Sequence, residues 1–272
     1  MKFEKIYLEK NENVYMDAYI ADPIPNLIRK AILVIPGGGY GNVCMTREGE
    51  PIAMAFIPYG YHAFVLHYSH AGNDERVFPT QLVQTSKAIK YIKEHAQEYL
   101  IDPEQVFVAG FSAGGHLAGC LGTMWHKQEI YDEIDMPYGY NKPTGVMLIY
   151  PVVTGVEEYR HFSSFKNLLG EDNPSMEKLA MCSLEKNVDS RSCPVFMLHT
   201  ADDQLVNVRN SLTLAQAYAD ADMKFELHIY PKGSHGVALG NRITRCSVED
   251  WENTAIAKWI ENAVMWADSI KK

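Results

Sequence analysis

The sequence lacks the features that mark several large classes of protein. Its 272 residues contain no run of about 18 apolar residues, the minimum for crossing a bilayer. Lysine and arginine total 25 against 34 aspartates and glutamates, which gives a formal net charge of −9. This shortage of positive charge argues against binding to phosphate backbones and to anionic membrane surfaces. We therefore expect no nucleic-acid partner and no membrane partner.

Cysteine pairs and a secretory leader are also missing. The five cysteines are scattered along the chain without a CxxC pair, which argues against both a zinc site and a redox dithiol. The first ten residues carry charges throughout and have no apolar segment of the kind found in signal peptides. We therefore expect reduced thiols in a cytoplasmic protein, with no bound metal.

The chain instead contains short apolar runs that alternate with longer amphipathic segments. Hydrophobic residues make up 47% and charged residues 22%, close to the average for a globular protein. This alternation predicts an α/β fold, with a mostly parallel sheet and helices on both of its faces. The expected strands are 31–35, 63–67, 105–109, 146–150, 195–199 and 224–230, and the expected helices are 79–97, 117–125, 207–221 and 249–270.

The organisation of the chain favours a single domain over 1–272. Neither an internal repeat nor a linker rich in Pro, Gly or Ser divides it. Residues 2–8 and 14–20 are expected to form an antiparallel hairpin at one edge of the sheet, where an exposed strand would allow two subunits to pair. The irregular segments 120–143 and 151–193 are rich in Tyr, Met, Pro and Asn, and we expect them to form a small cap over a site.

The strongest local motif is GFSAG at 110–114, which matches G-x-S-x-G. An expected strand precedes it and an expected helix follows it, which is the context of a nucleophile elbow. The tight turn of such an elbow requires small residues on both sides of the serine. The motif therefore predicts that Ser112 is a catalytic nucleophile.

A serine nucleophile needs a base, and the base needs an acid to orient it. Asp202 and Asp203 directly follow the expected strand 195–199, and His235 directly follows the expected strand 224–230. The order Ser, Asp, His is that of the nucleophile-elbow enzymes. One aspartate would orient His235 while the other caps the helix that follows, and the sequence leaves open which does which.

Acyl transfer also needs hydrogen-bond donors for the oxyanion of the tetrahedral intermediate. The backbone N–H of Ala113, the residue after the nucleophile, is one candidate. The glycine-rich loop 36–41 is the expected source of the second. A phosphate-binding loop is the rival interpretation, but the glycines fit neither GxxxxGK[ST] nor GxGxxG.

These segments together resemble the α/β-hydrolases of the esterase and lipase group, in particular bacterial acetylesterases related to acetylxylan and feruloyl esterases. The resemblance extends from about residue 31 to residue 267. It rests on PGGGY (36–40), REGEP (47–51), IDP (101–103), GFSAGGHL (110–117), HTADD (199–203) and KGSHG (232–236).

The resemblance implies a triad of Ser112, His235 and an aspartate, with Asp202 as the first choice and Asp203 as the second. It also implies oxyanion donors from Gly38, Gly39 and Ala113. We therefore expect a serine esterase that needs no cofactor and acts on small esters with short acyl chains, including acetylated sugars or xylo-oligosaccharides. The alternatives are a serine peptidase of the oligopeptidase type and a hydrolase-like binding protein without catalysis.

Overall fold

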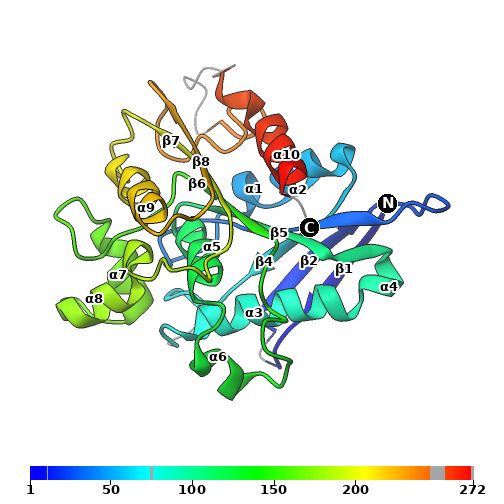
Figure 1. Cartoon of the computed structure of the whole chain (residues 1–272), viewed down its shortest axis with the longest axis horizontal. Helices are drawn as coiled ribbons and strands as arrows, with labels where there is room; N and C mark the ends of the chain where they lie inside the picture. The colour runs from blue at the N-terminus through cyan, green and yellow to red at the C-terminus, as the bar shows by residue number, and fades with distance from the viewer. Residues whose placement is uncertain (11, 74–75, 246–254, 271–272) are drawn as a thin grey trace.

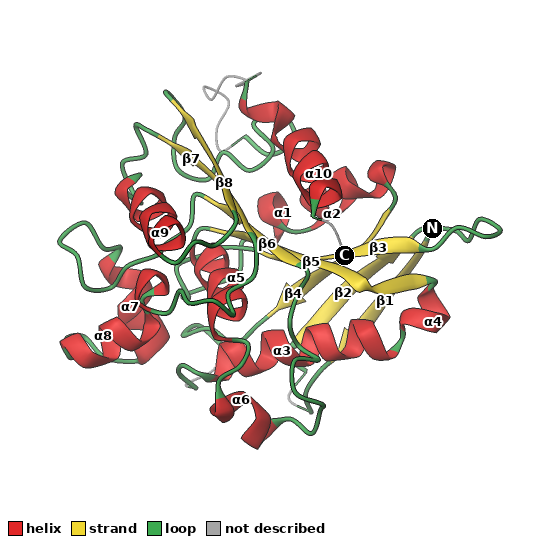
Figure 2. Cartoon of the chain, viewed as in Figure 1, coloured by secondary structure: helices red, strands yellow, loops and turns green. Residues whose placement is uncertain are grey.

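An eight-stranded sheet forms the centre of the computed structural model, which describes residues 1–10, 12–73, 76–245 and 255–270 (Figure 2). The strand order is β1-β2-β4-β3-β5-β6-β7-β8. β1 pairs antiparallel with β2, and β2 pairs antiparallel with β4, whereas every other pair is parallel. The strands are β1 (Lys2–Tyr7), β2 (Tyr15–Ile20), β3 (Arg29–Ile35), β4 (Tyr61–His67), β5 (Ile101–Phe111), β6 (Gly145–Ile149), β7 (Val195–Thr200) and β8 (Phe225–Tyr230).

Helices cover both faces of this sheet (Figure 1). α3, α5 and α9 contribute Leu82, Leu117 and Leu214 to the core on one face. α2 and α10 contribute Ile52 and Trp259 to the core on the other face. The helices are α1 (Met45–Glu48), α2 (Glu50–Phe56), α3 (Thr80–Glu94), α4 (Ala96–Tyr99), α5 (Ala113–Met124), α6 (Gln128–Glu133), α7 (Phe162–Leu169), α8 (Met176–Cys182), α9 (Arg209–Asp220) and α10 (Trp259–Ser269).

The apolar runs of the central strands follow from burial on both faces. Along β3, Leu33 and Ile35 belong to the core on the α3 side, while Ile32 and Val34 belong to the core on the α2 side. Successive side chains of a strand point to opposite faces, so a strand covered on both faces needs apolar residues at every position. The predicted fold class, a mostly parallel sheet between helices, is confirmed.

The individual elements agree closely with the expected ranges. Each expected strand matches one of β3 to β8, and the expected edge hairpin matches β1 and β2. The expected helix 249–270 is found as α10 after a short 3₁₀ turn at Ile256–Lys258. The expected start of that helix, at 249–254, lies outside the described residues.

The two segments expected to form a cap differ in where they lie. Segment 151–193 contains α7 and α8, and Asn167 on α7 donates a hydrogen bond to the Gly39 carbonyl oxygen in the glycine-rich loop. Segment 120–143 contains α6, which packs on α3, and its Asn141 donates to Ser86 of α3. The proposal of a cap therefore rests on 151–193. No described helix has both the length and the apolar character to cross a membrane.

Candidate active site

The candidate residues converge because the parallel strands all end at one edge of the sheet. Ser112 directly follows β5, the glycine-rich loop follows β3, Asp203 follows β7, and His235 follows β8. The carboxyl ends of parallel strands are where open α/β sheets place their ligand sites.

Ser112 lies in a strained turn between β5 and α5. Its backbone dihedrals are φ 53° and ψ −118°, and its amide N–H donates to the Ile149 carbonyl at the end of β6. A positive φ at a residue with a side chain costs on the order of 1–3 kcal/mol, so the surrounding packing must enforce it. Gly114 makes the turn possible, since a Cβ at that position would lie 2.2 Å from the Ile35 carbonyl oxygen.

Ser112, His235 and Asp203 form an unbroken chain of hydrogen bonds. Ser112 Oγ is 2.8 Å from His235 Nε2 and can donate its proton to that nitrogen. His235 Nδ1 donates to Asp203 Oδ2 over 2.7 Å. Ser112 is only 7% exposed, so the reacting groups lie largely out of bulk water. This arrangement matches the geometry of a nucleophile, its base and an orienting acid.

Asp203 is held as a carboxylate by a dense set of donors. Its Oδ1 accepts from the backbone N–H groups of Leu205 and Val206, each at 2.9 Å. His199 Nε2 lies 3.3 Å from its Oδ2, beside the bond from His235. Burial opposes the charge, but the hydrogen bonds from His199 and His235 outweigh it and hold the pKa of Asp203 well below its usual range.

The expectation that Asp202 is the orienting acid is wrong in this structure. The Asp202 side chain is exposed, and its Oδ1 accepts a hydrogen bond from the Gly233 backbone N–H at 2.8 Å. Asp203 makes the contact with His235 instead. The physical reason is the turn after β7, which directs the two adjacent side chains differently. Asp202 binds the backbone of the loop after β8, residues 231–245 (the histidine loop), while Asp203 reaches the His235 imidazole.

The expected oxyanion donors lie in the glycine-rich loop and at the first residue of α5, directly after Ser112. Among the described residues, no hydrogen-bond partner takes the backbone N–H of Gly38, Gly39 or Ala113. The loop lies against the nucleophile, since a Cβ on Gly37 would come within 2.9 Å of Ser112 Cβ. Their role as oxyanion donors stays a prediction.

Two side-chain contacts hold the far part of the glycine-rich loop. The Tyr40 hydroxyl lies 2.8 Å from Nδ1 of His116, a fully buried histidine on α5. Asn167 Nδ2 donates to the Gly39 carbonyl oxygen over 2.9 Å. The loop is therefore fixed both to the helix that follows the nucleophile and to α7.

The near end of the loop is held by a buried carboxylate that was not among the expected site residues. Glu48 Oε2 accepts from the Gly37 backbone N–H at 2.7 Å, and its Oε1 accepts from the Tyr150 hydroxyl at 2.8 Å. Glu48 is 4% exposed. The segment REGEP at 47–51 carried a resemblance but no recognisable chemistry, so it gave the only sequence signal for Glu48.

His161 was also not expected, and it brings a titratable group from segment 151–193 to the site. Its Nδ1 is 2.8 Å from Ser164 Oγ, and a Cβ on Gly39 would lie 4.0 Å from its Cε1. Burial lowers the pKa of His161, and the charge on His235 lowers it further. His161 is therefore a neutral polar group next to the glycine-rich loop at pH 7.

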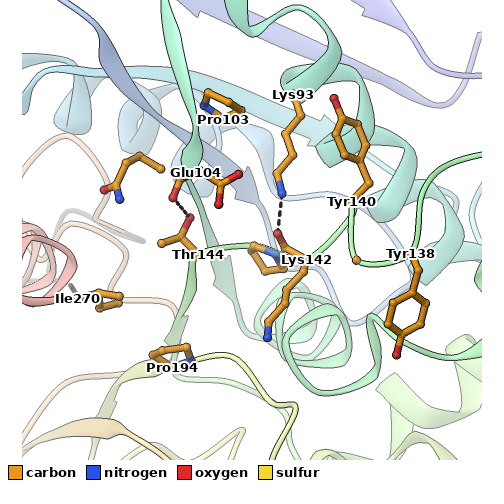
Figure 3. Close-up of a pocket in the computed structure, with 12 residues that line it drawn as sticks. Lys93, Pro103, Glu104, Tyr138, Tyr140, Lys142, Thr144, Pro194 and Ile270 are labelled. Carbon is orange, nitrogen blue, oxygen red and sulfur yellow. Dashed lines mark hydrogen bonds between the residues drawn. The ribbon is translucent and has the colours of Figure 1, made fainter. Parts of the chain in front are cut away.

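A separate hollow lies at the opposite edge of the sheet (Figure 3). It has a volume of about 660 Å³ and is lined by Pro103 and Glu104 on β5 and by residues just before β6 and β7. Two hydrogen bonds join residues of its lining: Lys93 donates to the Lys142 carbonyl, and Thr144 donates to the Glu104 carbonyl. This hollow contains none of the residues of the Ser112 site.

Comparison with known proteins finds relatives that include esterases. The model of the BD-FAE family matches residues 16–218. The chain is 35% identical over 252 residues to endo-1,4-beta-xylanase B of Butyrivibrio fibrisolvens, with 88% of this chain and 38% of that protein covered. It is 32% identical to the acetylxylan esterase of Xylanibacter ruminicola, with 78% of this chain and 42% of that protein covered. The chain thus spans about two fifths of the length of these curated relatives.

Solved structures match the fold along nearly the whole chain. The acetyl ester-xyloside bifunctional hydrolase from Caldicellulosiruptor lactoaceticus has a TM-score of 0.83 and 31% identity, with 98% of this chain and 96% of that chain covered. A carboxylesterase from Lactobacillus plantarum has a TM-score of 0.85 and 25% identity, with 98% and 97% covered. These similarities confirm the expected α/β-hydrolase fold.

Proposed function

We propose that this chain, which belongs to the BD-FAE family of α/β-hydrolases, is a carboxylic ester hydrolase that cleaves short-chain acyl esters through an acyl-enzyme on Ser112. Acetylated sugars or xylo-oligosaccharides are the proposed substrates. The observation that carries the mechanism is the pair of contacts at 2.8 Å and 2.7 Å that link Ser112, His235 and Asp203.

In the proposed first step, Ser112 Oγ attacks the carbonyl carbon of the ester while its proton passes to His235 Nε2. The carbonyl oxygen becomes an oxyanion, and the free N–H groups of Gly38, Gly39 and Ala113 are the donors available to it. Asp203 holds the imidazole in the tautomer that accepts this proton, and its negative charge stabilises the imidazolium that forms.

Collapse of the tetrahedral intermediate completes acylation. His235 gives the proton from its Nε2 to the leaving alcohol, and the acyl group stays on Ser112 Oγ. A water molecule then attacks the acyl-enzyme while the same nitrogen takes its proton, and a second collapse returns that proton to Ser112. The carboxylic acid leaves and the free enzyme is restored.

Support for the sugar ester comes from the names of the relatives. An acetylxylan esterase and an acetyl ester-xyloside bifunctional hydrolase are both at least 31% identical to the chain. The half-buried His161 supplies a polar group beside the glycine-rich loop, where a sugar hydroxyl would find a hydrogen-bond partner. A short acyl group is consistent with a nucleophile that is only 7% exposed.

The first test compares the wild type with Ser112→Ala in the hydrolysis of p-nitrophenyl acetate. We expect the substitution to lower kcat by about 10⁶-fold, because no other group replaces the nucleophile. Ser192→Ala is the matched control, because it removes another buried serine hydroxyl that lies outside the site. Equal rates in wild type and Ser112→Ala would overturn the esterase mechanism and favour a binding protein without catalysis.

The substrate class is tested separately by the release of acetate from acetylated xylo-oligosaccharides. We expect kcat/KM to exceed the value for an acetyl ester of a simple alcohol of similar reactivity. If the two values are equal, the sugar portion makes no specific contact, and only the broader assignment as a short-chain esterase stands.

A further inference from the structure

We propose that Glu48 is a positioning residue for acyl transfer. Its two carboxylate oxygens hold the glycine-rich loop 36–41 (the oxyanion loop) and the histidine loop after β8 in fixed positions relative to each other. This inference rests on the proposed function, since it assigns a role to a residue that would touch neither substrate nor the reacting atoms.

The contacts of Glu48 reach both loops. Its Oε2 accepts from Gly37 at the start of the glycine-rich loop, over 2.7 Å. Its Oε1 accepts from the Tyr150 hydroxyl over 2.8 Å. The Tyr150 hydroxyl oxygen in turn accepts from the Ala238 backbone N–H over 3.1 Å, three residues beyond His235. A continuous chain of hydrogen bonds therefore joins the loop after β3 to the loop after β8.

Neighbouring contacts strengthen the same link. The Tyr150 ring packs edge-on against the His235 imidazole, with the ring centroids 5.0 Å apart. Arg47, the residue before Glu48, donates to the carbonyl oxygens of Gly236 and Thr244. The short helix α1 thus holds the histidine loop through two adjacent side chains, while Glu48 also reaches the oxyanion loop.

The directions of these hydrogen bonds fit a carboxylate and do not fit an amide. Both Glu48 oxygens accept, because Gly37 offers an N–H and the Tyr150 oxygen already accepts from Ala238. A glutamine has one acceptor oxygen and two N–H donors. Its amide group would face either the Gly37 N–H or the Tyr150 hydroxyl, so one donor of the buried chain would lose its acceptor.

The charged groups that act on Glu48 include the catalytic histidine, His235. Burial raises the pKa of Glu48, while the bonds from Gly37 and Tyr150 and the charges of His235 and Arg47 act in the opposite direction. The buried Tyr68 also faces Glu48, and the negative charge of Glu48 contributes to the raised pKa of that phenol. Glu48 and His235 are therefore close enough for the charge of one to act on the other.

The rival interpretation is that Glu48 only stabilises the fold. The two roles are separated by comparing Glu48→Gln, Tyr150→Phe and Tyr218→Phe with the wild type. Tyr218→Phe is a matched control: Tyr218 is buried, its hydroxyl donates to the Cys193 carbonyl over 3.1 Å, and it lies outside the site. Each variant leaves a buried donor or acceptor without its hydrogen-bond partner, so we expect similar decreases in melting temperature.

The kinetic readout is kcat and KM for p-nitrophenyl acetate, together with the rate at which a fluorophosphonate probe labels Ser112. We expect Glu48→Gln and Tyr150→Phe to lower kcat and the labelling rate by about tenfold to a hundredfold, the cost of a misplacement of about 1 Å. KM should change little, because the lost interaction acts in the transition state. Tyr218→Phe should keep the wild-type kcat.

The double variant sharpens the test. Because Glu48 and Tyr150 act in one chain of hydrogen bonds, the combined substitution should cost little more than either substitution alone. Tyr150→Phe keeps the carboxylate, so it tests the inference even if Glu48→Gln fails to fold.

Two results would overturn the inference. One is wild-type kcat and labelling rate in a folded Glu48→Gln or Tyr150→Phe variant. The other is a kcat loss no greater than that of Tyr218→Phe at equal loss of melting temperature. Failure of the proposed function would look different, because the wild type and Ser112→Ala would then hydrolyse the ester equally well.

Discussion

Two buried carboxylates contact the Ser112 site, and their pKa values are displaced in opposite directions. Asp203, in the loop after β7, has its pKa held well below the usual range. Glu48, at the end of α1, has its pKa raised. Burial disfavours the charge on both groups, so the difference follows from what else surrounds each carboxylate.

The surroundings differ in the number of donors. Asp203 accepts from two backbone N–H groups and from His235, and His199 lies within 3.3 Å. Within the described part of the chain, the Glu48 carboxylate accepts from the Gly37 backbone N–H and the Tyr150 hydroxyl. In the proposed mechanism Asp203 faces an imidazolium in each turnover, and its larger set of donors keeps it charged. Glu48, proposed only to position two loops, has fewer donors to offset the cost of burying its charge.

The largest effect predicted by this comparison is that of Asp203→Asn. We expect kcat for p-nitrophenyl acetate to fall by about 10⁴-fold, because an amide leaves His235 in the wrong tautomer and without a negative charge beside it. The matched change is Asp202→Asn, which keeps an oxygen that can accept from Gly233 and does not alter the Asp203 contact with His235. It should retain activity within a fewfold of wild type.

Circular dichroism and a thermal melt of both variants check that each is folded. A larger loss of kcat in Asp202→Asn than in Asp203→Asn would contradict the assignment of the orienting acid. It would mean that the turn after β7 adopts another conformation during catalysis.

The same two carboxylates should leave opposite signatures in the pH dependence of stability. The pKa of Asp203 is depressed, so its stabilising contribution is complete above the ordinary value of 3.8 and is lost as the pH falls below it. The pKa of Glu48 is raised, so its contribution decreases as the pH rises from the ordinary value of 4.5 through the value in the folded protein. Opposite signs follow because folding lowers proton binding at Asp203 and raises it at Glu48.

Urea denaturation of the wild type, Asp203→Asn and Glu48→Gln at a series of pH values measures these contributions. Asp203→Asn should flatten the acid side of the stability profile by on the order of 2 kcal/mol. Glu48→Gln should gain stability relative to wild type as the pH rises above 4.5. Parallel profiles for all three proteins would show that neither carboxylate has a displaced pKa.

The fold was predictable because buried parallel strands leave a clear pattern. β3 to β8 each appear in the sequence as a short apolar run, and the residues that follow them come together at the same edge of the sheet. The positions of Ser112 and His235 followed from that rule. Short helices gave no such pattern, since α1 and α2 contain four and seven residues and complete too few turns to show a period.

The finer details of the site depended on contacts that sequence spacing does not encode. Asp202 and Asp203 are neighbours of the same residue type, and only the turn after β7 decides which carboxylate reaches His235. Glu48 looks in the sequence like any charged residue of a solvated segment. Its burial depends on Gly37 and Tyr150, which come from segments far from it in the chain.

The smallest predicted effect concerns Asn167, which holds the glycine-rich loop on the α7 side through a neutral amide rather than a carboxylate. Asn167→Ala removes the hydrogen bond to the Gly39 carbonyl oxygen and frees the loop on the α7 side. A neutral hydrogen bond contributes about 1 kcal/mol, so we expect kcat/KM for p-nitrophenyl acetate to fall only about fivefold. Asn187→Ala is the matched control, since Asn187 donates to the Met181 and Ser183 carbonyls in the same segment and has no contact with the loop. A loss as large as that of Glu48→Gln would mean that α7 positions the oxyanion loop as strongly as the buried carboxylate does, and that the loop's register depends on both sides equally.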